Sequence, residues 1–239
     1  MAPLLLHSRR PELTEEMDRP DCDPERLRRT YRQFAILNRL ISRWDHLYRS
    51  EVRPLLASRP ENMGPARLLD IGFGGGDIPA RLARLARGDG FRLKVTAVDS
   101  DPRAVDYAAE RHAGSGVRYR LASPAQLLEK GEAGDYDLVT SNHLMHHLAP
   151  GELGELLGQA RRLSCGPVLF CDIERSDWAW LLFGLLSRPF FHRSFITRDG
   201  LRSIRRSYTR RELRAAAPPG WEVRALPLFR LLLVHRGEP

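Results

Sequence analysis

Lysine is almost missing from this 239-residue chain, although the chain is basic. Lys94 and Lys130 are its two lysines, and arginine supplies the rest of the 38 basic residues behind a formal net charge of +8. We attribute this skew to the codon bias of a GC-rich genome. Because the arginines are spread along the chain and form no single basic block, the charge alone does not favour a nucleic-acid partner.

Cysteine and long apolar runs are also scarce. The three cysteines, Cys22, Cys165 and Cys171, show no C-x-x-C spacing, which disfavours a zinc knuckle or a redox dithiol and suits a reducing cytosol. The longest apolar stretch, Trp178 to Leu186, is far shorter than the roughly 20 residues of a membrane-spanning helix. The apolar run within residues 1–6 is too short for a signal-peptide core. We therefore expect a soluble, cytoplasmic protein.

The length of the chain fits one α/β domain with an accessory lid. We expect a flexible N-terminal extension over residues 1–23, which are rich in proline and charge, and a helical cap over residues 24–60. In the cap, apolar residues from Leu27 to Tyr48 recur at the spacing of one long amphipathic helix. Residues 61–239 then form the main domain.

Short apolar strands alternate with helices along the main domain. The expected strands cover residues 67–71, 93–98, 117–121, 136–140 and 167–171. This alternation indicates a parallel sheet that is covered on both faces. Two final strands, at residues 221–226 and 230–234, are close enough in sequence to pair as an antiparallel hairpin. The sequence therefore predicts a doubly wound, Rossmann-like α/β fold with a seven-stranded, mostly parallel sheet and an antiparallel last strand.

The alternation stops at residues 176–207, which are rich in aromatic and aliphatic side chains. We interpret this stretch as an inserted helical lid. Its apolar side chains exceed what a surface helix needs, so they either pack onto the sheet or roof a pocket for an aromatic or alkyl-bearing molecule. A third interpretation is peripheral contact of Trp178 to Leu186 with a membrane, flanked by Arg175 and Arg188.

A glycine-rich turn after the first strand is the most informative motif of the chain. It reads Leu68-Leu69-Asp70-Ile71-Gly72-Phe73-Gly74-Gly75-Gly76-Asp77. Its glycines permit a tight turn and the close approach of a ligand, at the strand end where α/β folds bind ligands. A dinucleotide fingerprint would need glycine in place of Asp77. Asp70 and Asp77 disfavour a pyrophosphate and suit a cationic ligand such as S-adenosylmethionine, which carries a sulfonium and an ammonium.

Asp99 ends the second strand, where an acid can accept hydrogen bonds from both hydroxyls of a ribose. NAD-dependent enzymes place an acid at the same point, and Asp99 could instead cap the following helix, so this residue alone does not discriminate. A histidine-rich segment, Ser141-Asn142-His143-Leu144-Met145-His146-His147-Leu148, follows the fourth strand. The D-x-G-x-G-x-G loop, Asp99 and this segment together resemble the class I S-adenosylmethionine-dependent methyltransferases. The similar types are the ubiquinone/menaquinone-biosynthesis and natural-product O-methyltransferases.

The resemblance implies S-adenosylmethionine as the cofactor and an N-terminal helix that folds over it. The expected cofactor-binding residues are Tyr31, Arg32, Asp70, Gly72, Gly74, Asp99, Ser100, Ser123 and Asn142. The chain departs from the family after the third strand, where Ala122-Ser123-Pro124 lacks the usual acid that faces the adenine amine. We therefore expect backbone groups or the Ser123 hydroxyl to hold the adenine.

Histidines and an acid at neighbouring strand ends are the candidate catalytic groups. His143 and His146 follow the fourth strand, and Asp172 closes the fifth on the same edge of the sheet. A carboxylate beside a histidine fixes its tautomer and raises its basicity, which suits removal of a phenol proton. The resemblance to natural-product O-methyltransferases implies His146 as the base and Asp172 as the orienting acid. His143 is the alternative base, a purely structural role for the histidines stays open, and no metal site is expected.

These features predict methyl transfer to a small aromatic or otherwise apolar acceptor, such as the phenolic hydroxyl of a polyketide- or quinol-like compound of secondary metabolism. The alternatives are a C-methyltransferase of quinone or isoprenoid type and an RNA or protein methyltransferase. The strand-four segment lacks an Asn-Pro-Pro-Tyr-type motif, which disfavours nucleic-acid or protein substrates. The sequence does not predict the oligomeric state.

Overall fold

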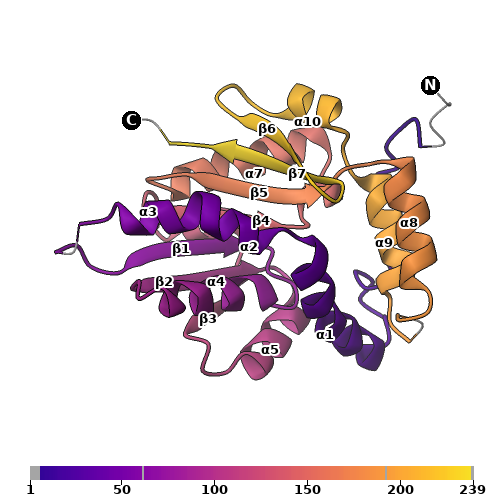
Figure 1. Ribbon diagram of the computed structural model, residues 1–239, viewed down its shortest axis with the longest axis horizontal. Coiled ribbons are helices and arrows are strands. Elements are labelled where there is room, and N and C mark those ends of the chain that lie inside the picture. The colour runs from indigo at the N-terminus through magenta and orange to yellow at the C-terminus, as the bar shows by residue number, and fades with distance from the viewer. Residues whose placement is uncertain (1–5, 61, 192, 238–239) are drawn as a thin grey trace.

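The computed structural model describes residues 6–60, 62–191 and 193–237, and within them seven strands form one sheet (Figure 1). The strand order is β3-β2-β1-β4-β5-β7-β6, with β7 antiparallel to its neighbours. The strands are β1 (Ala66–Ile71), β2 (Leu93–Asp99), β3 (Val117–Leu121), β4 (Leu138–Asn142), β5 (Val168–Ile173), β6 (Glu222–Leu226) and β7 (Arg230–His235). The predicted Rossmann-like, seven-stranded sheet with its C-terminal hairpin is confirmed.

Helices cover both faces of the sheet because alternate residues of the buried strands point to opposite sides. One face packs against α6 (Pro124–Glu129), α7 (Pro150–Leu163) and α10 (Arg210–Ala216), with Leu153 and Phe170 in its core. The other face packs against α4 (Asp77–Gly88) and the helices that precede β1. Helix α5 (Pro102–Arg111) follows β2 and packs with Tyr31 at the strand ends.

The N-terminal cap is broken into several helices. They are α1 (Pro24–Ile41), α2 (Trp44–Leu47), the π-helix η1 (Tyr48–Val52) and α3 (Arg53–Ala57). The prediction of one helix through Tyr48 is therefore wrong. The backbone N–H and the hydroxyl of Ser42 both donate to the Asn38 carbonyl, and Arg43 takes a left-handed conformation at φ 64°. This break turns Trp44 into the core against the sheet, where it is 1% exposed.

Strand β4 begins two residues later than predicted. The Asp137 side chain accepts the backbone N–H of Arg67 at 2.7 Å, so regular pairing with β1 starts after it. Tyr136 instead forms an isolated bridge with Ser164. The strand also ends two residues later than predicted, so that Ser141 and Asn142 lie at its carboxyl end.

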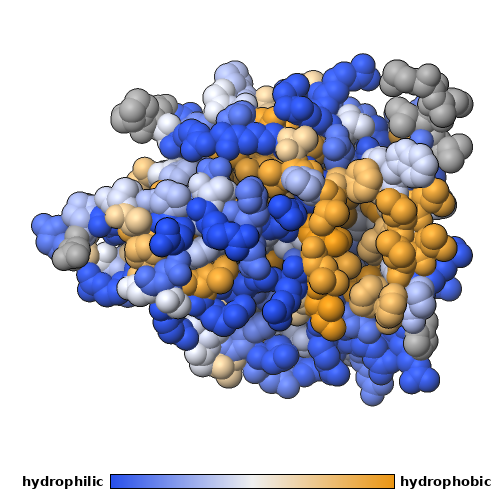
Figure 2. Space-filling view, in the orientation of Figure 1, coloured by the Kyte–Doolittle hydropathy of each residue, from blue (hydrophilic) through white to orange (hydrophobic). Residues whose placement is uncertain are grey.

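Helices α8 (Asp177–Ser187) and α9 (Ile196–Arg206) lie together beyond the strand ends, across from α1 (Figure 1). Helix α8 presents large apolar side chains to solvent (Figure 2). Arg175, which the sequence placed on the flank of this stretch, is buried and pairs with Glu212. Within the described residues, no helix combines the length and apolar content needed to cross a bilayer.

Candidate cofactor and acceptor site

The glycine loop turns at the end of β1 through left-handed glycines. Gly72, Gly74 and Gly76 have φ values of 71°, 52° and 75°. A Cβ on Gly76 would lie 2.7 Å from Ala108 and 2.9 Å from the Tyr119 ring, so only glycine lets the loop pack against α5 and β3. A Cβ on Gly74 would meet nothing within 4 Å. The loop is therefore packed on one side and open to the cavity on the other.

Asp99 lies beside this loop at the end of β2. Its Oδ2 accepts the Gly74 N–H at 2.9 Å, and its Oδ1 accepts the Asp101 N–H at 3.0 Å. Burial raises the pKa of Asp99. Each carboxylate oxygen has a further lone pair, so Asp99 can hold the hydroxyls of a bound ribose while it anchors the loop.

Three acids, of which Asp70 is buried and Asp77 and Asp99 are half-buried, give this end of the cavity a negative character. Burial raises the pKa of Asp70 to about 7 and that of Asp77 to about 6, and Asp99 shifts in the same direction. The Asn38 amide of α1 donates to both Asp77 oxygens, and the Thr140 hydroxyl donates to Asp70 at 2.6 Å. Buried acids are stabilised by a cationic ligand and repel a phosphate. The residues present therefore fit the sulfonium and ammonium of S-adenosylmethionine and do not fit a dinucleotide.

The remaining predicted cofactor residues lie at the same cavity, with one exception. Tyr31, Ser100, Ser123 and Asn142 line it, and Ser123 also caps α6 by accepting the Gln126 N–H. Arg32 is exposed and does not line the cavity, so its prediction as a cofactor contact is not supported. One residue along a helix is a rotation of about 100°, which turns Arg32 away when Tyr31 faces inward.

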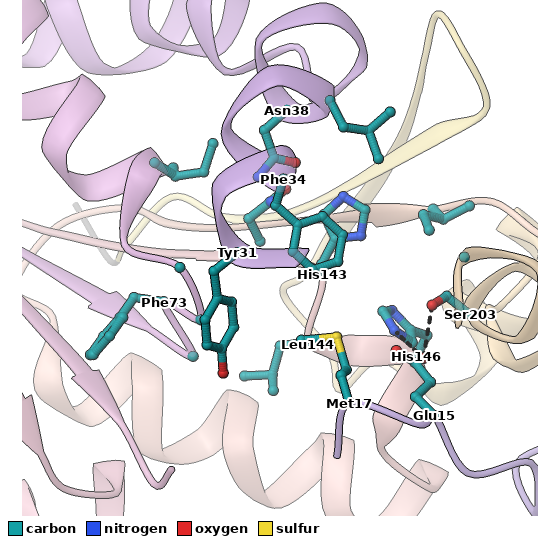
Figure 3. A pocket seen from close by; sticks show the side chains of 18 of the residues that line it. Glu15, Met17, Tyr31, Phe34, Asn38, Phe73, His143, Leu144, His146 and Ser203 are labelled. Atoms are coloured by element: carbon teal, nitrogen blue, oxygen red, sulfur yellow. Dashed lines mark hydrogen bonds and ion pairs between the residues drawn. The ribbon is translucent and has the colours of Figure 1, made fainter. Parts of the chain in front are cut away.

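One cavity of about 1170 Å³ extends from the glycine loop to the histidines after β4. Phe34 and Leu37 of α1 line it on one side, and Leu182, Phe183 and Leu186 of α8 line it on the other. Figure 3 shows Tyr31, Phe34 and Leu144 between the two ends. The space beyond the glycine loop is thus walled largely by apolar side chains, as an aromatic or alkyl acceptor requires.

His146 lies at the far end of this cavity between two carboxylates. It is on the short helix η2 (Met145–His147), where its backbone N–H and its Nδ1 contact the two oxygens of Asp172 at 2.9 and 2.8 Å. Its Nε2 lies 3.3 Å from Oε1 of Glu15. Burial opposes the charge of His146, but Asp172 and Glu15 outweigh it and raise its pKa to about 9. The imidazole therefore carries both protons at neutral pH in this conformation.

His143 occupies a different environment, although it lies only three residues earlier. Its Nε2 accepts a hydrogen bond from the Arg230 guanidinium at 2.8 Å, and Arg230 also donates to Asn142 at 2.9 Å. Burial first and then the charge of Arg230 lower the pKa of His143 well below its usual range. The lone pair that a base would use is therefore occupied, which favours His146 over His143 as the base.

Sequence reasoning missed Glu15, Met17 and Asp18 as residues of the site. They belong to residues 6–23, expected as a flexible extension, yet all three line the cavity. The backbone N–H groups of Glu16 and Met17 donate to the Asp199 carboxylate at 2.8 and 3.0 Å, which fixes the segment on α9. Nothing in its irregular, charged sequence indicates this contact, because the partner lies 182 or more residues away.

Two groups of side chains have ligand atoms within 4.8 Å of one another and could hold a metal ion. One is Glu15, His146 and His147, and the other is His143, His146 and Asp172. The two groups share His146, whose Nδ1 is engaged by Asp172. The second group also contains His143, whose Nε2 faces the Arg230 cation. The group of Glu15, His146 and His147 is therefore the better arranged of the two to bind a metal cation.

Known proteins match the central part of the chain. Residues 68–164 match the family model of a methyltransferase domain. Over 89 residues the chain is 44% identical to a ubiquinone biosynthesis O-methyltransferase of a Caulobacter species, covering 36% of this chain and 32% of that protein. A protein of the same name from Xanthomonas axonopodis pv. citri is 36% identical over 130 residues, which is 53% of this chain and 51% of that protein. The chain thus spans about a third to a half of the length of these curated relatives.

Solved structures share the fold at low sequence identity. An S-adenosylmethionine-dependent methyltransferase from Aquifex aeolicus superposes with a TM-score of 0.55 at 15% identity, over 89% of this chain and 97% of that one. The CurJ carbon methyltransferase superposes with a TM-score of 0.54 at 18% identity, over 79% of this chain and 52% of that one. The family match identifies residues 68–164 as a methyltransferase domain, and the order of the strands agrees with the fold that these solved S-adenosylmethionine-dependent and carbon methyltransferases share.

Proposed function

We propose that the protein transfers a methyl group from S-adenosylmethionine to the phenolic hydroxyl of a small, largely apolar acceptor of polyketide or quinol type. The observation that carries this proposal is the single cavity that joins the acidic glycine-loop end to the His146–Asp172 pair. Both ends line the same space, and apolar side chains line the span between them. The names of the similar ubiquinone biosynthesis O-methyltransferases are consistent with transfer to oxygen.

The cofactor end of the cavity has the task of binding and orientation. When bound, S-adenosylmethionine supplies a sulfonium-borne methyl group that an acceptor oxygen can attack in line. Asp99 would hold the sugar, and the carboxylates of Asp70 and Asp77 would attract the positive charges of the cofactor. Tyr31 and Asn38 of α1 close this end from the outside, which limits the entry of water.

The acceptor end has the task of moving a proton. Asp172 accepts from Nδ1 of His146, so Nε2 is the atom left to take the proton of a phenol. Nε2 can do so only when it carries no proton of its own. The pKa of about 9 in this conformation means that the neighbouring carboxylate Glu15 must first leave Nε2.

Replacement of His146 by alanine tests this role. We expect His146→Ala to lower turnover of a phenolic acceptor by about 100-fold or more, as loss of a general base does, while affinity for S-adenosylhomocysteine stays unchanged. His46→Ala, at an exposed position on α2, is the matched control. The assay follows transfer of labelled methyl to a panel of phenols, naphthols and quinols. Full turnover in His146→Ala, or label on carbon alone, would overturn the proposal.

We further propose that α8 brings the cavity mouth to an anionic membrane surface, from which an apolar acceptor can enter. Trp178, Leu185 and Leu186 are 66%, 68% and 62% exposed, and Leu40 on the α1 rim is 68% exposed. Figure 2 shows the exposed apolar side chains of α8 and of α1 as two strips on the same face. Arg188, at the end of α8, is exposed and can face anionic headgroups.

Vesicle binding tests the membrane contact. Vesicles that contain phosphatidylglycerol should retain the protein in sedimentation. The double variant Trp178→Ser with Leu185→Ser should bind about 10-fold more weakly, because two apolar side chains lose their burial in the interface. Met63→Ser is the control, since Met63 is 50% exposed on the loop before β1. Equal retention of the double variant and the control would contradict the contact.

A further inference from the structure

A carboxylate of the chain itself fills the acceptor end of the cavity. Oε1 of Glu15 lies 2.8 Å from the Ser203 hydroxyl, 3.3 Å from Nε2 of His146 and 3.8 Å from Nη1 of Arg206. Glu15 is 3% exposed and lines the cavity. Figure 3 shows Glu15 reaching toward His146 and Ser203 from the N-terminal segment. A proton donor and two cationic side chains thus converge on one oxygen.

Two of these donors are not fully satisfied by Glu15. Nε2 of His146 and Nε of Arg206 are buried and have no hydrogen-bond partner in the described part of the chain. The contact of His146 with Glu15 has the distance of an ion pair without the direction of a hydrogen bond. A buried donor without a partner is costly, so these groups are arranged for an oxygen other than the one that now lies there.

The charges around this position favour an acidic oxygen. The groups packed there are Glu15 and Asp18 from the N-terminal segment, His147 from η2, Asp172 from β5, His143 after β4, Arg206 from α9 and Arg230 from β7. Asp172 is already paired with His146. Removal of Glu15 would therefore leave the His146 cation facing an apolar cavity, and the Arg206 cation near it, with one anion fewer.

Displacement of the segment that carries Glu15 would break no helix or strand, because residues 6–23 contain neither. The segment is held by hydrogen bonds and ion pairs, among them the Glu16 and Met17 N–H groups on Asp199, the Arg10 N–H on the Arg205 carbonyl and the Arg103 guanidinium on the Met17 carbonyl. Met17 and Asp18 line the same cavity, so withdrawal of the segment would also widen the space for an acceptor.

We infer that His146, Ser203 and Arg206 form a binding subsite for the acidic oxygen of the acceptor, a carboxylate or a phenolic oxygen, and that Glu15 occupies this subsite until the acceptor displaces it. The inference rests on the proposed function for its acceptor and adds the group that is recognised. It also accounts for the proton on His146. A phenol that displaces Glu15 brings no negative charge, so His146 keeps one carboxylate neighbour instead of two and its pKa falls. The Nε2 proton then passes to solvent, and Nε2 can receive the proton of the phenol.

A binding experiment without methyl transfer tests the subsite. Calorimetry measures the affinity of benzoate, and of the neutral benzamide, for the protein saturated with S-adenosylhomocysteine. Because the internal carboxylate no longer competes, we expect Glu15→Ala to bind benzoate about 10-fold more tightly or better than the unaltered protein. Benzamide should bind equally to both. Glu15→Gln, which keeps the size of the side chain, should gain in the same direction.

Two further variants separate charge recognition from a merely larger cavity. Glu12→Ala removes an exposed carboxylate of the same segment and should leave benzoate affinity unchanged. Adding Ser203→Ala to Glu15→Ala should remove most of the gain. An equal gain for benzamide, or no gain in a Glu15 variant that still binds S-adenosylhomocysteine, would overturn the subsite. A clear gain for benzoate with no methylation of any phenol would instead contradict only the proposed function.

Discussion

The two ends of the cavity are assembled in different ways. At the cofactor end, Asp70, Gly74 and Asp99 come from one strand–loop–helix–strand unit, and the Gly74 N–H donates directly to Asp99. At the acceptor end, Glu15, His146 and Ser203 come from three segments that lie far apart in the chain. The glycines and the three acids of the first end lie within one local unit, to which α1 and the ends of β3 and β4 add further side chains. The second exists only when the N-terminal segment, the sheet edge and α9 come together.

This difference separates two kinds of function. The local unit supports a cofactor shared by the whole family, so it depends on backbone turns and a few acids. The assembled end meets the acceptor, and here a change in one segment alters which groups face the cavity. Variants at the first end should therefore change cofactor affinity alone, and variants at the second should leave it unchanged.

The largest effect that separates the two ends is expected at Asp99. Asp99→Ala removes the carboxylate that anchors Gly74 and that we propose as the ribose ligand, so affinity for S-adenosylhomocysteine should fall by about 100-fold. Calorimetry measures it, with Asp106→Ala on the exposed face of α5 as the control. Benzoate should bind Asp99→Ala as it binds the unaltered chain. A parallel loss of benzoate affinity would mean that the two ends are not independent.

A smaller, pH-dependent effect is expected at Asp70. Burial raises its pKa to about 7, so the carboxyl becomes an anion, and attracts a ligand ammonium, only as pH rises through that value. Affinity for S-adenosylhomocysteine should increase about 10-fold between about pH 5.5 and 8. Asp70→Asn should flatten most of this rise and leave the part due to Asp77, whose pKa is raised to about 6. Equal pH profiles for the two proteins would exclude Asp70 as the cause.

The raised pKa of Asp70 also predicts how the thermal stability of the protein changes with pH. The folded protein binds the Asp70 proton more tightly than the unfolded chain, whose aspartates have a pKa near 3.8. Without ligand, thermal stability should therefore fall as pH rises from about 4 to about 7, and Asp70→Asn should lessen that fall.

The smallest effect is expected where α8 meets α9. A Cβ at Gly200 would lie 2.3 Å from the Phe183 ring, so Gly200→Ala should force the ring aside and cost about 1–2 kcal/mol of unfolding free energy. Cofactor affinity should not change. Gly184→Ala is the control, because its Cβ would meet Leu201 at an ordinary 3.4 Å. Thermal unfolding measures the stability of both variants. Weaker cofactor binding in Gly200→Ala would mean that the two ends of the cavity are coupled.

Much of the fold could be predicted because its signals are local. Apolar strands, the glycine loop and the C-terminal hairpin each depend on neighbours in sequence, and the seven-stranded sheet follows from them. The errors arise where a side chain adds a hydrogen bond near the end of an element. Asp137 takes the Arg67 N–H and delays β4, and Ser42 bonds to Asn38 and ends α1 early. Periodicity does not register either event, because the apolar pattern continues through both.

In the candidate site, too, the residues that could be predicted are those whose positions follow from local sequence. Asp99 and the glycines could be placed from their spacing, and the structure brings His146 and Asp172 to 2.8 Å because they follow neighbouring parallel strands. The involvement of Arg230 and Glu15 could not be foreseen. Arg230 reaches His143 only because β7 inserts beside β5, and Glu15 lies in a stretch without periodicity.

The sequence by itself determined the sheet, the turn that receives a cationic nucleoside and the identity of the acids beside it, since these depend on backbone conformation over short distances. Tertiary structure alone decided the charge state of His146. That proton depends on Asp172 and Glu15 contacting different nitrogens of the ring, and Glu15 reaches it only through the packing of a segment more than a hundred residues away in the chain.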